Sequence, residues 1–177
     1  YIWESPSSSI EGVEFLRKKI KEYDGVIAVG SGTVSDSIKY ATCLEKKSYS
    51  VFATTPMNAY TTGTASISFD GIKKSLVAHY AQGVFFDLEV LSMCPKRLTA
   101  AAFADVICRT TAQVDWLMSH KILKTDYQTA PYSLLALYEK DMIESASLIA
   151  KGDIEALALL TRISAIMGLG TSFTQTT

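Results

Sequence analysis

The chain has 177 residues, of which 48% are hydrophobic, and it carries 17 Lys and Arg against 18 Asp and Glu. This apolar content suffices to bury a core in one domain or two small ones, and the near balance of charge gives no field that would attract nucleic acid or an anionic membrane. Because no apolar run reaches the length of a membrane span and no signal-peptide pattern opens the chain, we expect a cytoplasmic protein that binds neither nucleic acid nor membrane.

The first predicted elements are a helix and a buried strand. Ser8 and Glu11 have capping-box spacing, and apolar residues at helical spacing extend the helix to about Tyr23. A turn then leads into residues 26–29, a run of apolar and mostly β-branched residues. Such apolar continuity is typical of a strand buried on both faces, as in a parallel sheet.

A glycine-rich turn follows this strand and is the most informative stretch of the chain. It reads Gly30-Ser31-Gly32-Thr33, and Asp36 follows on the next predicted helix. Glycines at the end of a strand remove Cβ atoms, so a phosphate can approach backbone N–H groups at the N-terminus of a helix. The same pattern also serves as a plain tight connection, so these residues alone leave both interpretations open.

The alternation of elements then continues to residue 87. A helix is predicted over residues 34–45, and a buried strand over 49–53 runs into Thr54, Thr55 and Pro56. Strand, helix and strand in this order predict a parallel sheet with right-handed crossovers. Further short strands are expected at residues 64–69, 75–79 and 83–87, the first two joined by the Asp70-Gly71 turn.

The character of the sequence changes at Pro95, beyond which only amphipathic helices are predicted. They span about 98–122, 132–151 and 153–168, with a hairpin at Gly152-Asp153, and a loop is expected from Gly168 to the last residue. We therefore expect an α/β part over residues 1–94 and an all-helical part over 95–177. Because the chain starts at Tyr1 without an initiator methionine and ends in a predicted loop, we also expect a fragment.

One carboxylate and three cysteines complete the chemically informative residues. Asp105 stands alone among small and apolar residues, so it must be ion-paired, bind a metal or face water, and spacing alone favours an exposed or paired carboxylate. His79 and His120 do not have metal-ligand spacing to it. The cysteines are widely spaced and odd in number, which favours reduced thiols over a disulfide framework or a zinc knuckle; they are Cys43, Cys94 and Cys108.

Four segments in order resemble a known family. They are VGSGTVSDSIKY, ATTPMNAYTTG, GVFFDLEVLSMCP and LTAAAFADVICRTTAQVDW, and they cover most of residues 24–120. Together they resemble the sn-glycerol-1-phosphate dehydrogenase and glycerol dehydrogenase family, part of the iron-containing alcohol dehydrogenase and dehydroquinate synthase-like superfamily. The resemblance implies a partial Rossmann-like parallel-sheet domain that binds NAD or NADP, followed by an all-helical domain that binds a divalent metal.

The resemblance also assigns roles to residues. Asp105 corresponds to the first ligand of the catalytic metal, commonly zinc, with iron or nickel as alternatives, and it lies against the substrate. Asn58 corresponds to a substrate-contacting aspartate, and the family's two histidine ligands lie beyond Thr177. The cofactor-binding residues implied are Gly30, Ser31, Gly32, Thr33 and Asp36 at the pyrophosphate, and Thr54, Thr55 and Thr62 at the nicotinamide side.

The implied function is an NAD(P)- and metal-dependent dehydrogenase. It would interconvert glycerol 1-phosphate, or a glycerol-like polyol, and dihydroxyacetone phosphate or the corresponding ketone, most often as a homo-oligomer. Five residues depart from the family pattern. Ala53 and Pro56 stand where Thr and Ser are usual, and Asn58 replaces the aspartate. Arg109 stands where a Lys is usual, and Ala104 replaces a glycine. Two alternatives therefore stay open, a dehydroquinate synthase-like lyase and a degenerate member that binds nucleotide without turnover.

Overall fold

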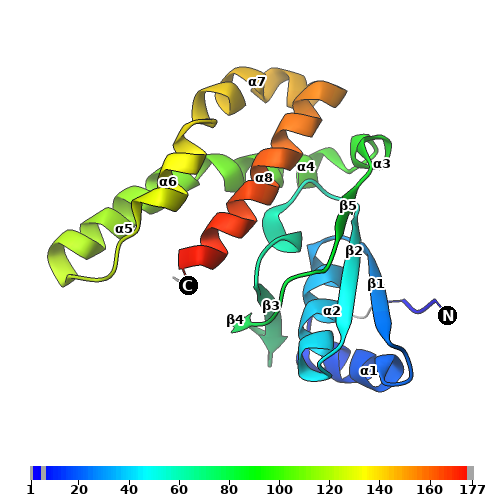
Figure 1. Ribbon diagram of the computed structural model, residues 1–177. Coiled ribbons are helices and arrows are strands. Elements are labelled where there is room, and N and C mark those ends of the chain that lie inside the picture. The colour runs from blue at the N-terminus through cyan, green and yellow to red at the C-terminus, as the bar shows by residue number, and fades with distance from the viewer. Residues whose placement is uncertain (1, 5–6, 175–177) are drawn as a thin grey trace.

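The computed structural model describes residues 2–4 and 7–174. The first part of the chain is an α/β unit, in which β1 (Gly25–Gly30), β2 (Ser48–Ala53) and β5 (Val84–Phe86) form a parallel sheet in the order β1-β2-β5 (Figure 1). Strand β1 pairs with β2 from Gly25 opposite Ser48 to Gly30 opposite Ala53. The predicted α/β class and the parallel pairing are confirmed.

Helix α2 (Gly32–Leu44) packs on one face of this sheet, and α1 (Ile10–Ile20) packs against α2. The N-cap of α1 is Ser9, whose hydroxyl accepts a hydrogen bond of 3.2 Å from the N–H of Gly12. The predicted cap at Ser8 is therefore wrong by one residue. Serines stand at both positions, and the sequence spacing to Glu11 does not reveal which one lies next to the first helical turn.

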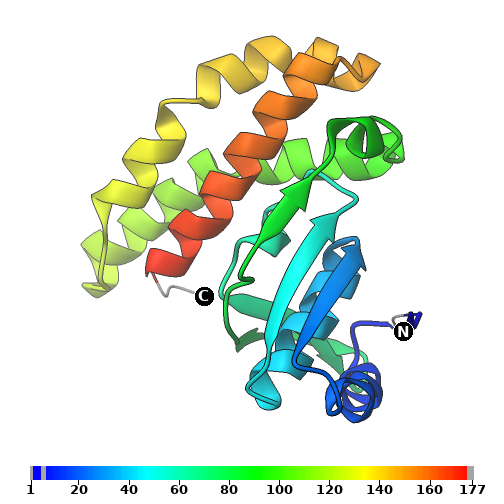
Figure 2. The ribbon, with the colours of Figure 1, turned by 45° about the vertical axis from the view of Figure 1, so that its right-hand side comes forward.

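The prediction that β1 is buried on both faces is wrong for the part of the chain that the structure describes. Ala28 is buried under the helices, whereas Ile27 is 72% exposed and Val29 is 62% exposed on the opposite face. Figure 2 shows α2 behind the strands and no helix in front of β1 and β2. The described residues therefore cover only one face of β1, although its side chains are apolar on both faces.

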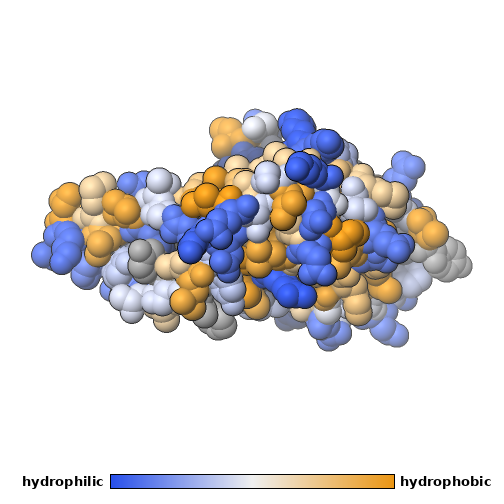
Figure 3. Space-filling model, turned by 90° about the horizontal axis from the view of Figure 1, so that it is seen from above, coloured by the Kyte–Doolittle hydropathy of each residue, from blue (hydrophilic) through white to orange (hydrophobic). Residues whose placement is uncertain are grey.

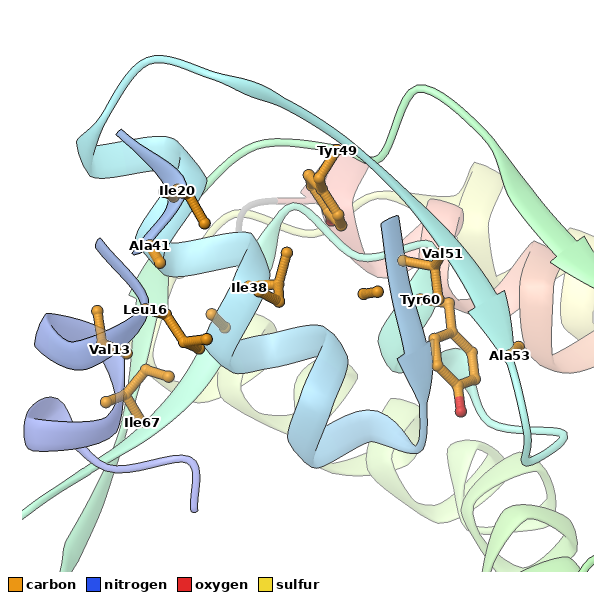
Figure 4. Close-up of a cluster of buried hydrophobic side chains, with 12 residues drawn as sticks. Val13, Leu16, Ile20, Ile38, Ala41, Tyr49, Val51, Ala53, Tyr60 and Ile67 are labelled. Atoms are coloured by element: carbon orange, nitrogen blue, oxygen red, sulfur yellow. The ribbon is translucent and has the colours of Figure 1, made fainter. Parts of the chain in front are cut away.

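The core of the α/β unit lies between α1, α2 and the sheet (Figure 4). Apolar residues at helical spacing on α1 and at alternate positions on β2 meet there, as their periodicities require. Tyr60 joins this core although it lies outside the sheet and these helices. Fully buried members are Val13, Ile20, Ala41, Tyr49, Val51, Ala53, Tyr60 and Ile67.

A hairpin formed by β3 (Thr64–Phe69) and β4 (Ile72–Val77) confirms the predicted turn at Asp70-Gly71. Both turn residues have positive φ, 49° and 81°, which suits the two-residue turns that match the twist of paired strands. The second strand begins three residues earlier than predicted. Two short helices were not predicted: the 3-10 turn η1 (Asn58–Tyr60) and α3 (Leu88–Ser92), which Asp87 caps.

After Pro95 the described elements are all helices, joined by short turns and a loop over 124–128, but two predicted boundaries are wrong. The predicted helix over 98–122 divides at Cys108 into α4 (Lys96–Ile107) and α5 (Arg109–Leu123). The ψ of Cys108 is −13°, away from the usual helical value, and its thiol lies 3.2 Å from the carbonyl oxygen of Asp105. The predicted helix over 132–151 is likewise two helices, α6 (Thr129–Ala136) and α7 (Glu139–Lys151).

The last helix, α8 (Ile154–Thr174), extends through the loop predicted from Gly168, whose final residues 175–177 lie outside the described residues. The predicted hairpin before α8 is confirmed, since Gly152 has φ 82° and the Asp153 carboxylate accepts a 3.0 Å hydrogen bond from the N–H of Ala156. The helix crosses beside η1 in Figure 1. No helix among the residues described has the length and apolarity needed to cross a membrane.

A second core joins α4, α7 and α8. It contains buried apolar side chains that the helical periodicity places on facing sides. Met57 packs against this core and also against the first one, so the segment just before η1 lies between the two. The buried members of the second core include Ala102, Met142, Ile149, Leu157, Leu160, Ile163 and Met167.

Candidate dinucleotide and substrate site

The glycine turn lies where a parallel strand ends and a helix begins. Gly30 ends β1 with φ 155°, and a Cβ at this position would lie 2.7 Å from Cγ2 of Val34, so only glycine fits without strain. The Ser35 N–H donates to the Ser31 carbonyl oxygen at 3.0 Å, the first bond of α2 that returns along the helix. The N–H groups that precede Ser35 at the start of α2 have no carbonyl partner within the helix, and they lie at its N-terminus, where an anion is stabilised.

Two side chains accompany these amides. Ser31 is the N-cap residue of α2, and its hydroxyl makes no capping hydrogen bond. Thr33 lies in the first turn and is exposed. The predicted pyrophosphate residues at the turn therefore present backbone amides, one hydroxyl that does not cap the helix and one exposed threonine.

The turn is anchored through the carbonyl oxygen of Gly30. It accepts hydrogen bonds from the Thr54 N–H at 3.1 Å and from the Tyr60 hydroxyl at 3.0 Å. Tyr60 also shares a 2.6 Å hydrogen bond with the Thr55 hydroxyl, and burial raises the pKa of the phenol. Thr55 is 2% exposed, so its side chain supports Tyr60 in this structure, while Thr54 lies half-buried after β2.

A buried lysine that the sequence analysis missed lies behind the turn. Lys39 is 0% exposed, and its ammonium donates to the Ala59 carbonyl at 2.6 Å, the Thr64 carbonyl at 2.9 Å and the Thr62 hydroxyl at 3.0 Å. Three short bonds match the three N–H donors of an ammonium. The Asp36 carboxylate adds an ion pair at 3.4 Å.

Asp36 and Lys39 share an environment that works against both charges. Burial raises the pKa of the Asp36 carboxyl and lowers the pKa of Lys39, and the attraction between the two groups opposes both shifts. The second carboxylate oxygen of Asp36 accepts a 3.2 Å hydrogen bond from the N–H of Ser66 on β3. Asp36 and Thr62, both predicted to bind cofactor, are therefore engaged with Lys39 inside the protein.

The short turn η1 carries Asn58 and is packed between two helices. A Cβ on Gly32 would lie 3.3 Å from Cβ of Ala59, so η1 contacts the N-terminus of α2. On the other side, the Thr61 hydroxyl donates to the Ala165 carbonyl of α8 at 2.9 Å. The structure thus brings half-buried Asn58 into the same region as the glycine turn.

Gly168 explains why α8 continues where a loop was predicted. A Cβ at this position would lie 2.5 Å from the Asn58 carbonyl oxygen and 2.1 Å from the Thr61 hydroxyl oxygen. Glycine costs a helix about 1 kcal/mol relative to alanine, but here it lets the helix backbone approach η1. The glycine marks a close contact rather than a helix end.

Asp105 lies on α4 with its side chain 34% exposed, and its carboxylate pairs with the Arg109 guanidinium at 3.8 Å. Among the residues that the structure describes, no group of three His, Cys, Asp or Glu side chains could hold a metal ion. The residues in hand therefore do not fit a complete metal centre, and Asp105 has a cationic partner instead.

Both histidines make structural contacts. Nε2 of His79 lies 2.9 Å from the hydroxyl oxygen of Thr42, a residue of α2. The ring stacks on Tyr49 at 5.2 Å, and burial lowers the pKa of His79. Nδ1 of His120 lies 2.6 Å from the Thr125 carbonyl oxygen in the loop after α5.

Comparisons with known proteins agree with this geometry. Residues 1–95 match the family model described as iron-containing alcohol dehydrogenase. The glycerol-1-phosphate dehydrogenase [NAD(P)+] of Pyrococcus abyssi is 34% identical over 149 residues, which are 82% of this chain and 43% of that protein. The enzyme of the same name from Halalkalibacterium halodurans is 29% identical over 150 residues, or 84% of this chain and 38% of that protein. The chain thus spans about two fifths of the length of these relatives.

Solved structures show the same fold. A probable glycerol dehydrogenase from Sinorhizobium meliloti superposes with a TM-score of 0.78 at 17% identity, over 94% of this chain and 50% of that one. An iron-containing alcohol dehydrogenase from Thermotoga maritima gives a TM-score of 0.77 at 16% identity, over 99% and 52% of the two chains. With more than half of its residues matched by the family model, the chain belongs to the iron-containing alcohol dehydrogenase family.

Proposed function

We propose that this chain provides the dinucleotide-binding turn and the substrate-facing turn of an NAD(P)-dependent dehydrogenase. The substrate pair we propose is glycerol 1-phosphate, or a similar polyol, and dihydroxyacetone phosphate or the corresponding ketone. The observation that carries the proposal is the glycine turn at the end of β1, which opens the N-terminus of α2 and packs directly against η1. The names of the relatives support this substrate class.

The residues of the glycine turn have a binding and orienting role in this proposal. The first amides of α2 and the Ser31 hydroxyl bind the pyrophosphate, and the anchored Gly30 carbonyl keeps them in place. A bound nicotinamide supplies the hydride acceptor or donor. Tyr60 and Thr55 hold the glycine turn in place without a ligand, so the loss of conformational entropy on binding is small.

Asn58 is the residue we propose for the substrate. Its amide can donate and accept hydrogen bonds, as a polyol hydroxyl requires, but it carries no charge. Its position next to the glycine turn brings the substrate toward the nicotinamide side of the cofactor, where Thr54 follows β2. Orientation of this kind accelerates a transfer between two bound groups.

The family name implies a metal, and we propose Asp105 as the residue of this chain that would contribute to its site, with zinc as the first candidate and iron or nickel as alternatives. In the structure this carboxylate pairs with Arg109, and the described residues do not complete a ligand set. We assign no step of the reaction to a metal here.

We also propose a division at Pro95 and a homo-oligomeric assembly. Several apolar side chains of α5 are exposed, and Figure 3 shows apolar side chains at the surface at the end of the molecule where α5 lies. Faces of this kind usually meet a partner. The exposed α5 residues are Val114, Leu117, Met118, Ile122 and Leu123.

The three cysteines are free, which agrees with the reducing cytoplasm that we propose as the compartment of the protein.

The test is an assay of the protein expressed from its complete reading frame, with NADH or NADPH and dihydroxyacetone phosphate. We expect nucleotide oxidation that depends on the ketone, and a raised KM for the ketone in Asn58→Ala. A second candidate, nucleotide binding without turnover, is favoured by the pairing of Asp105 with Arg109. NADH binding without oxidation of the nucleotide by any ketone tested would decide for this second candidate.

A further inference from the structure

The turn from Asn58 to Thr62 is held from two opposite sides by residues that contact no predicted ligand. On the side of α2, Lys39 bonds to the Ala59 carbonyl and to the Thr62 hydroxyl. On the side of α8, Gly168 allows the helix to reach the Asn58 carbonyl oxygen. The turn therefore joins the helix that begins at the glycine turn to the last helix of the chain.

The contacts of Lys39 are costly ones to maintain. An ammonium with no exposure loses its hydration, which costs several kcal/mol unless hydrogen bonds and a counter-charge replace it. Two of its three short bonds go to the turn, at the Ala59 carbonyl and the Thr62 hydroxyl, and the third goes to the Thr64 carbonyl, where β3 begins. A role in general core stability needs no such charge, because an apolar side chain of similar length would fill the space.

The contact at Gly168 is equally specific. The atoms that an added Cβ would strike are the Asn58 carbonyl oxygen and the Thr61 hydroxyl oxygen, and both belong to the turn. The Thr61 hydroxyl in turn bonds to the Ala165 carbonyl, one helical turn earlier on α8. A backbone oxygen cannot move aside without moving its residue, so a methyl group at position 168 has to displace the turn or the helix.

We propose that Lys39 and Gly168 are positioning residues that fix the Asn58–Thr62 turn and thereby set where Asn58 meets the substrate. The substrate part of this inference rests on the proposed function; the fixing of the turn does not. The Asp36 carboxylate completes the device, because it pairs with Lys39 and bonds to the N–H of Ser66 on β3.

The test compares Lys39→Met and Gly168→Ala in the protein expressed from its complete reading frame. Hydrogen exchange of peptides that cover residues 57–64 reports on the turn, and we expect exchange at least ~10-fold faster there than in the wild type, with β1 and β2 unchanged. We expect a raised KM for dihydroxyacetone phosphate with a smaller change in kcat, and an NADH Kd within about twofold of the wild type.

Two matched controls separate this role from general destabilisation. Lys47→Met removes a lysine that donates to the carbonyls of Lys21 and Tyr23, neither of which belongs to the Asn58–Thr62 turn. Gly25→Ala adds a Cβ whose nearest contact is an ordinary 3.8 Å from the Ser48 carbonyl oxygen. Both controls should leave exchange at residues 57–64 unchanged.

The outcomes are distinct. Unchanged exchange at residues 57–64 in Gly168→Ala, or acceleration equal to that of the controls, overturns the inference. Gly168→Ala removes no buried charge, so it decides the matter if Lys39→Met does not fold. Local acceleration in a protein that oxidises no NADH would uphold the fixed turn and reject the proposed function. Normal activity and KM in both variants would reject the positioning role and leave the proposed function standing.

Discussion

Placing a negative charge at Thr33 should have opposite effects on stability and on nucleotide binding. Thr33 is exposed in the first turn of α2, so Thr33→Asp buries nothing and removes no core contact. A carboxylate in the first turn interacts favourably with the helix dipole, which is worth about 0.3–1 kcal/mol. No acidic residue occupies that turn in the natural sequence, so we expect the free energy of unfolding to stay equal or to rise.

The same charge should repel a bound pyrophosphate. Two unit charges about 5 Å apart repel by roughly 1–3 kcal/mol at effective dielectric constants of 20–80. A loss of this size corresponds to roughly a 5- to 150-fold increase in the NADH dissociation constant. The repulsion should weaken in high salt because the site is open to solvent.

Fluorescence titration with NADH and urea unfolding are the two assays, and Thr33→Asn is the matched neutral control. We expect Thr33→Asn to bind NADH nearly as the wild type does and Thr33→Asp to bind it weakly while unfolding at equal or higher urea. Equal NADH affinity in the aspartate and asparagine variants would refute a pyrophosphate at the N-terminus of α2.

Three further predictions follow from single side chains. Gly30→Ala should lower the free energy of unfolding by about 1–3 kcal/mol in urea titrations, because alanine is strained at φ 155° and its Cβ meets Val34; an unchanged midpoint would show that the turn relaxes freely. Because the pKa of His79 is lowered in the folded state, the unfolded chain binds more protons between the lowered pKa and 6.5, so the free energy of unfolding should rise with pH across this window. His79→Gln should flatten this rise, and an identical slope in the variant would contradict the prediction. Asp105→Asn should change stability by about 0.5 kcal/mol or less, since its ion pair is partly exposed, but should lower the metal content of the complete protein by elemental analysis; unchanged metal would remove Asp105 from the ligand set.

The sequence predicted the elements whose signals are local. The apolar run before Gly30 and the Asp70-Gly71 turn each specify their structure within a few residues, and both were found close to the expected positions. The glycine turn likewise lies between strand and helix as predicted, because a positive φ at Gly30 is a local requirement.

The features that the sequence did not reveal depend on contacts between distant segments. Lys39 looks like one more charged residue on a helix, and only the closing of residues 59–64 over it shows that it is buried. Its position three residues after Asp36, on the side of α2 that carries Ile38 and Thr42, was the available signal. Gly168 was interpreted as a helix end because glycine disfavours helices, whereas its close approach to Asn58 exists only in the folded chain.

The central claim, that this chain binds a dinucleotide at the N-terminus of α2, is tested most directly by calorimetric titration of NADH into the protein expressed from its complete reading frame. We predict saturable binding at a single class of site, weakened by Thr33→Asp and retained in Thr33→Asn. No binding heat up to ~1 mM NADH at two temperatures, a limit that corresponds to about −4 kcal/mol of binding free energy, would contradict it.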